Sequence, residues 1–170
     1  LSLHDALPIW STHVTDGFAV WSAGRQLLQE ARNMALAIFF FDALIGNGDR
    51  RDIKPNILVR GDDFRLIDHE LAFRDYMLLA KPAGPWETGG MSAMVVPGAH
   101  IFAARLMHDR DLAFEPIRAA WSTLSDQQVD AYLAALPPQW LADRSLATFA
   151  IRRIKECRDK IDECVAECRR

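Results

Sequence analysis

The order of hydrophobic and polar positions predicts a mainly α-helical chain with one small β-hairpin. Between Ser22 and Ile45, apolar residues recur at helical spacing, and the second half of this segment is apolar nearly all round. We therefore expect a helix whose C-terminal half is buried. It should end at Gly46-Asn47-Gly48, because glycine and asparagine tolerate the left-handed backbone of a helix C-cap.

Two short β-type runs follow this helix. Residues 56–60 and 64–68 are rich in isoleucine, leucine, valine and phenylalanine, and a Gly-Asp-Asp turn at 61–63 separates them. This pattern is typical of an antiparallel hairpin. The proline at position 55 is compatible with it, because a missing N–H is tolerated at the start of a strand.

The remainder of the chain predicts a loop and then helices. Residues 81–90 contain two prolines and three glycines and should form a loop, with Trp86 packed on the core. Helical patterns resume at 100–107, at 114–121, at 125–136 after a capping-box sequence, and from 145 to the end.

Composition and charge narrow the class of protein. With 170 residues, 50% of them apolar, the chain can bury one sizeable core. A net charge of −3 gives no basis for a nucleic-acid partner. The longest apolar stretch, 34–45, is too short to cross a bilayer, so no membrane span is expected. The chain has three cysteines, and their spacing should place all of them on one helix face: Cys157, Cys164 and Cys168. The odd number and this placement favour buried thiols in a reducing cytoplasm over disulfides or a zinc site.

Residues 1–9 are set apart from the rest. The sequence Leu-Ser-Leu-His-Asp-Ala-Leu-Pro-Ile resembles the translation of a widely used DNA-sequencing adapter. We expect it to be an artefact unrelated to the folded domain, so that neither His4 nor Asp5 is a candidate site residue. The domain is then expected to comprise residues 10–170.

The residues suited to chemistry lie between Asp49 and Asn56 and at Asp68, after the hairpin. Phosphoryl transfer requires a carboxylate beside the attacking hydroxyl, ligands that hold magnesium on the phosphates, and positive charge for the phosphoryl oxygens. Magnesium prefers oxygen ligands such as those of Asn and Asp. The hairpin should return the chain so that Asp68 approaches Asn56. Taken alone, a loop of this composition is also typical of a solvated turn.

The order of these residues resembles the catalytic and metal-binding loops of HipA-like and phosphatidylinositol-kinase-like proteins. The matching positions are Asn47, Asp49, Arg50, Arg51, Asn56, Ile67, Asp68 and His69. The resemblance is confined to residues 41–73. It implies the C-terminal lobe of a protein-kinase-like fold, with a catalytic loop at 47–56, a metal-binding loop at 66–70 and a helical remainder at 95–170.

The resemblance also implies a role for the matching residues. Asp49 would accept or orient the proton of the attacking hydroxyl, while Asn56 and Asp68 would bind Mg²⁺. Asn47 and His69 would lie on the cofactor-binding side of the site, towards ATP. His69 by itself is also typical of a structural residue that bonds to the backbone.

The catalytic carboxylate has two alternatives. Residues 51–56 also resemble the His-Arg-Asp-Ile-Lys-Pro-x-Asn loop of protein kinases with one residue deleted. In that register Asp52 is the catalytic carboxylate and Lys54 contacts the phosphate. Asp49 is preferred, because its match has no gap. In the Asp49 register Arg50 and Lys54 are expected to offset charge on the transferred phosphoryl group, although Lys54 is also typical of a solvated side chain.

The expected function is that of a C-terminal half of an ATP-dependent kinase. Its acceptor would be a hydroxyl group of a protein serine or threonine, or of a small molecule. No Gly-x-Gly-x-x-Gly motif and no Val-Ala-x-Lys strand precedes Asp49, so we expect the ATP-binding N-lobe to be missing and the chain by itself to be inactive. Two other functions stay open: a non-catalytic pseudokinase or binding module, and a metal-dependent phosphoesterase, for which the sequence lacks a second cluster of metal ligands.

Three further residues have less defined expectations. Asp42, on the buried helix, should either pair with a basic group or face the rim of the site. His100 and His108 are expected to be surface or core residues rather than catalytic ones.

Overall fold

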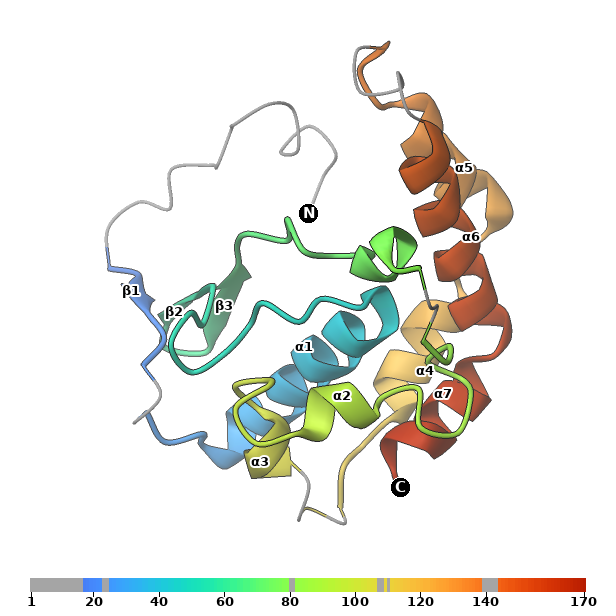
Figure 1. The fold of residues 1–170 in the computed structure, drawn as a ribbon. Coiled ribbons are helices and arrows are strands. Elements are labelled where there is room, and N and C mark those ends of the chain that lie inside the picture. Colours follow the sequence, from blue (N-terminus) through green and yellow to red (C-terminus); the bar gives the residue numbers. More distant parts are fainter. Residues whose placement is uncertain (1–16, 23–24, 80–81, 107–108, 110, 139–143) are drawn as a thin grey trace.

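The computed structural model describes residues 17–22, 25–79, 82–106, 109, 111–138 and 144–170. Over these residues the fold is mainly helical, with one three-stranded antiparallel sheet (Figure 1). The predicted fold class is confirmed at this level. The adapter-like residues 1–9 and His108 lie outside the described residues.

The central helix is α1, Arg32–Ile45, which a single 3-10 turn, η2 (Gln29–Ala31), precedes. The predicted start at Ser22 is wrong. Leu28 has an extended backbone (φ −66°, ψ 158°) and is 58% exposed, so the apolar spacing before η2 does not mark a helix face. The predicted end is confirmed, because α1 stops at Gly46, which is left-handed (φ 67°).

The predicted hairpin is confirmed as β2 (Ile57–Arg60) and β3 (Asp63–Leu66), paired antiparallel. A two-residue strand, β1 (Ala19–Val20), pairs with the other edge of β2. The sequence did not predict this third strand, since two residues are too few to show a period. Trp21 follows it and packs on Phe64 of β3, with ring centroids 5.6 Å apart.

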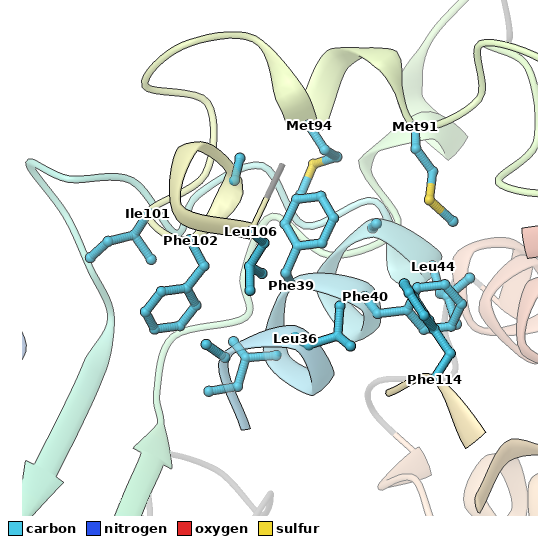
Figure 2. Close-up of a cluster of buried hydrophobic side chains, with 14 of the residues drawn as sticks. Leu36, Phe39, Phe40, Leu44, Met91, Met94, Ile101, Phe102, Leu106 and Phe114 are labelled. Atoms are coloured by element: carbon cyan, nitrogen blue, oxygen red, sulfur yellow. The ribbon is translucent and has the colours of Figure 1, made fainter. Parts of the chain in front are cut away.

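The core surrounds α1. Figure 2 shows its aromatic and aliphatic side chains meeting the short helices α2 (Ser92–Val95) and α3 (Ala103–Leu106). Phe40 packs edge-on against Phe114, with ring centroids 5.7 Å apart. The expected burial of the second half of α1 is therefore confirmed.

The C-terminal helices cover the other side of α1 from the sheet (Figure 1). They are α4 (Glu115–Ser122), α5 (Asp126–Ala134), α6 (Arg144–Asp159) and α7 (Ile161–Cys168), and the 3-10 helix η3 (Arg74–Met77) precedes them. The predicted capping box of α5 is confirmed, because Ser125 Oγ accepts from the Gln128 N–H (3.1 Å) and the Ser125 N–H donates to Gln128 Oε1 (2.8 Å).

The single helix predicted from residue 145 to the end is wrong. It breaks at Lys160 (φ −117°, ψ 33°), which separates α6 from α7. Cys157 lies on α6, whereas Cys164 and Cys168 lie on α7, so the three thiols do not share one helix face. Cys157 and Cys164 are buried, Cys168 is half-buried, and all three are free thiols. No helix in the described part of the chain is both long and apolar enough to span a bilayer.

Candidate active site

The site lies where α1 ends and the chain turns towards the hairpin. After Gly46, the Asn47 N–H donates to the carbonyl of Asp42 (2.8 Å), and its side-chain amide donates to the Asp42 carboxylate (2.8 Å). Both residues are buried. We refer to residues 46–56, which begin here, as the polar loop.

A buried network fastens the polar loop to α1. Arg50 Nε donates to Asp42 Oδ2 at 2.5 Å, and His100 Nε2 lies 3.1 Å from the same oxygen. The side chains of Asp42, Arg50 and His100 have no exposed surface. Of the two alternatives for Asp42, pairing with a basic group is confirmed. We call Asp42, Asn47, Arg50 and His100 the buried network.

Electrostatics keep Asp42 charged in this setting. Burial alone raises the pKa of Asp42, but hydrogen bonds to His100, Arg50 and Asn47 and the charge of Arg50 outweigh it, so its pKa lies below the usual value. The buried guanidinium is therefore matched by a full negative charge.

Arg50 also links the polar loop to the segment after the hairpin. Its Nη1 donates to the Asn56 carbonyl (2.5 Å), and its Nη2 lies 3.1 Å from His69 Nε2. The sequence led us to expect this residue at a phosphoryl group. The structure instead gives the guanidinium interior contacts, which are those of a residue that positions the loop.

Asp49 lies at the centre of the polar contacts of the loop. It is 2% exposed. Its Oδ1 accepts from Arg51 Nη2 (3.1 Å), and its Oδ2 accepts from Lys54 Nζ (2.5 Å) and Asn56 Nδ2 (3.2 Å). Burial raises the pKa of Asp49, but hydrogen bonds and charge from Lys54 and Arg51 outweigh it, so the pKa lies below the usual value and the group is a carboxylate at neutral pH.

The hairpin returns the chain to the polar loop, where the sequence predicted that Asp68 would approach Asn56. The Ile67 N–H donates to the Asn56 carbonyl (3.1 Å), which places Asp68 next to the polar loop. Lys54 Nζ lies 3.0 Å from Asp68 Oδ2 and 3.5 Å from Glu70 Oε1. We call Lys54 and the carboxylates of Asp49, Asp68 and Glu70 the Lys54 cluster.

The backbone is unusual at the two predicted metal ligands. Asn56 (φ 50°) and Asp68 (φ 56°) are both left-handed, a conformation that non-glycine residues adopt at a cost, although Asn and Asp adopt it most readily. Such strain often accompanies functional sites, since the surrounding structure must hold it in place. At Asn56, hydrogen bonds to its carbonyl from Arg50 Nη1 and from the Ile67 N–H hold the backbone in place.

Protonation states differ within this region. Hydrogen bonds to Asp49 and then Asp68 raise the pKa of Lys54, so its ammonium is charged. Burial and the nearby charge of Arg50 lower the pKa of His69, which is therefore neutral at pH 7. A neutral His69 can accept the Arg50 hydrogen bond through Nε2.

Asp52 lies apart from the Lys54 cluster. The backbones of Arg51 and Lys54 form a bridge, with N–H to carbonyl distances of 3.0 Å in both directions, and Asp52 occupies the exposed turn between them. Of the two candidate carboxylates, Asp49 is therefore the one that adjoins Asn56 and Asp68.

Sequence reasoning missed two features of the site. Glu70 was not a candidate, although it directly follows the matched Asp-His pair and is acidic. His100 had no assigned role, because nothing in its local sequence shows that its partner is Asp42 on α1. No local pattern predicts a contact between residues so far apart in the chain.

The donor set of the Lys54 cluster suits a hard divalent cation. Within the described residues, oxygens of Asp49, Asp68 and Glu70 lie within 4.8 Å of one another, and the Asn56 side chain contacts Asp49. Carboxylate and amide oxygens are the ligands that Mg²⁺ prefers. The ammonium of Lys54 already lies among them, which shows that the position attracts positive charge.

Comparison with protein-family models, with curated proteins and with solved structures finds no match for this chain. The function of the site is therefore inferred from its own geometry and chemistry.

Proposed function

We propose that this chain is the catalytic-loop lobe of a kinase-like phosphotransferase that uses ATP and Mg²⁺. The observation that supports this most is the convergence of Asp49 and Asp68, from either side of a β-hairpin, on the Lys54 ammonium, with the Asn56 amide in contact with Asp49. The HipA-like resemblance of the same residues supports the same reading. The helical architecture is compatible with the C-terminal lobe of a protein-kinase-like fold.

Each residue has a role in this proposal. Asp49, a carboxylate at neutral pH, accepts the proton of the acceptor hydroxyl as that oxygen attacks. Asn56 and Asp68 would hold Mg²⁺, which would neutralise charge on the phosphates of ATP. Lys54, whose Nζ lies 2.5 Å from Asp49 and 3.0 Å from Asp68, would offset charge on the transferred phosphoryl group. Arg50, which forms an ion pair with Asp42, keeps Asn56 and the polar loop in position.

The proposal includes a second lobe that covers the phosphates. The 170 residues contain no Gly-x-Gly-x-x-Gly segment, which in kinases closes over ATP. We therefore expect the chain alone to bind ATP weakly and to turn over little. The acceptor is a hydroxyl of a protein or of a small molecule, and the site does not distinguish between them.

The test is phosphate transfer from γ-labelled ATP by the complete product of the gene that encodes this chain. Asp49→Asn should lower kcat by about 10²–10⁴-fold, the usual contribution of a general base. Asp52→Asn is the matched control, since Asp52 is an acid in the same loop but lies in the exposed turn, and it should keep near-wild-type activity.

Three outcomes would redirect the proposal. Full activity of Asp49→Asn together with loss in Asp52→Asn would assign the other register. Mg²⁺-dependent ATP binding without transfer would indicate a pseudokinase. Hydrolysis of a simple phosphate ester in the absence of ATP would indicate a phosphoesterase.

A further inference from the structure

Lys54 occupies the position where the three carboxylates of its cluster converge. Its Nζ lies 2.5 Å from Asp49, 3.0 Å from Asp68 and 3.5 Å from Glu70. Asp49 belongs to the polar loop, and the other two acids follow β3. The Lys54 side chain is 41% exposed, so it has room to leave without disturbing the core.

We propose that Lys54 and a divalent cation exchange at this position: the ammonium holds the carboxylates together in the metal-free protein, and Mg²⁺ displaces it. This deepens the proposed function and rests on it, because it concerns the same cation position. It makes Lys54 a built-in competitor of the metal.

Competition follows from the geometry and the charges. Mg²⁺ requires oxygens at about 2.0–2.1 Å, and the Asp68 oxygen that would hold it lies within 4.8 Å of oxygens of Asp49 and Glu70. The Lys54 ammonium lies within hydrogen-bonding distance of two of those carboxylates. A dication and an ammonium so close together repel strongly, so the ammonium must move when the ion binds.

Exchange has a consequence for the site. Without a cation, three carboxylates so close together would repel one another, and Lys54 prevents this in the metal-free protein. After displacement, the flexible side chain keeps its ammonium near the metal, where an anion such as a phosphate oxygen can bind it. Metal binding is thereby coupled to the release of the Lys54 ammonium from its carboxylates.

Lys155 on α6 provides a matched control. Its Nζ also bridges two carboxylates, at 2.8 Å from Asp130 and 3.6 Å from Asp126 on α5. It has no described contact with Asp49, Asp68 or Glu70. A change that is specific to the Lys54 cluster should leave Lys155 unaffected.

The first measurement is the Mn²⁺ affinity of the 170-residue chain, with free Mn²⁺ counted by electron paramagnetic resonance and Mg²⁺ as competitor. Lys54→Met should bind Mn²⁺ roughly tenfold more tightly than wild type or better, because a positive charge a few ångströms from the ion is gone. Lys155→Met should match wild type.

The second measurement separates displacement from a general charge effect. In ¹⁵N-lysine-labelled wild-type protein, Mg²⁺ should shift or abolish the Lys54 ammonium signal with the midpoint of metal binding, and the Lys155 signal should not change. The exchange is overturned if metal binding depends on Asp68 while the Lys54 signal does not change. It is also overturned if Lys54→Met binds Mn²⁺ with the affinity of wild type. Both results leave the proposed function intact. Absence of Mn²⁺ binding in both wild type and Lys54→Met would also overturn the exchange, whereas the proposed function fails only if the complete gene product transfers no phosphate.

Discussion

Replacing Asp42 with asparagine tests whether the buried network holds the polar loop. Asn keeps the shape of the side chain but removes the negative charge that faces Arg50 at 2.5 Å in a fully buried setting. Breaking a buried ion pair on one side costs about 3–5 kcal/mol, because the remaining charge stays uncompensated. Domains of this size have about 5–15 kcal/mol of stability, so the loss is a large fraction of the total.

The measurement is urea unfolding at pH 7, followed by tryptophan fluorescence and circular dichroism. Asp130→Asn is the control, since its pair with Lys155 is exposed and such pairs contribute about 0–1 kcal/mol. Arg50→Met should cost a similar amount to Asp42→Asn, and the double variant should lose less than the sum because neither charge is then left alone. The reasoning is refuted if Asp42→Asn unfolds with the same free energy as the Asp130→Asn control.

Three other changes test the fold and its electrostatics. The pKa values of Asp42 and Asp49 are lower in the folded protein than the value of about 4 in the unfolded chain, so both carboxylates stabilise the fold above about pH 4. This stabilisation is lost as the pH falls through their folded pKa values. Urea unfolding between pH 7 and pH 3 should show the loss, and the free energy of unfolding should change less with pH in Asp42→Asn. Ser125→Ala should cost about 1 kcal/mol through loss of the capping box, and an unchanged urea midpoint would contradict that geometry. Phe102→Ala should cost about 3–5 kcal/mol, since the ring is fully buried; a loss under 1 kcal/mol by the same assay would place it outside the core.

The parts of the fold that could be predicted are those with strong local signals. Gly46 marks the end of α1 because a left-handed C-cap favours glycine, and the hairpin follows from its two β-type runs and its Gly-Asp turn. The capping box of α5 is likewise a local pattern. Each depends on contacts between residues close in the sequence.

The errors arose where tertiary packing decides the local structure. Leu28 has the spacing of a helix residue but an extended backbone. Lys160 breaks the last helix although nothing in its sequence stops it, and its ammonium then lies 4.3 Å from the centroid of the Trp86 ring. That aromatic contact lies between distant parts of the chain and leaves no periodic signal.

In the candidate site too, the features set by local sequence could be predicted and those set by tertiary contacts could not. Residue type and order singled out Asp49, Asn56 and Asp68, and the structure places Asp49 in contact with Asn56 and, through Lys54, with Asp68. The burial of Arg50 could not be predicted, because its partner Asp42 lies on another element. From the sequence alone, an arginine in a polar loop is expected to be solvated, because the acid that pairs with it is not evident.

The most direct test of the central claim is the divalent-cation affinity of Asp68→Asn, compared with wild type and with Asp62→Asn. Asp62 is an acid in the exposed turn of the hairpin, so its replacement removes the same charge away from the Lys54 cluster. Titration with Mn²⁺ should show a site in wild type and in Asp62→Asn that weakens at least about tenfold in Asp68→Asn, as loss of a charged ligand requires. Equal affinity in all three proteins would contradict the proposal that Asp68 holds a divalent cation beside Asp49 and Asn56.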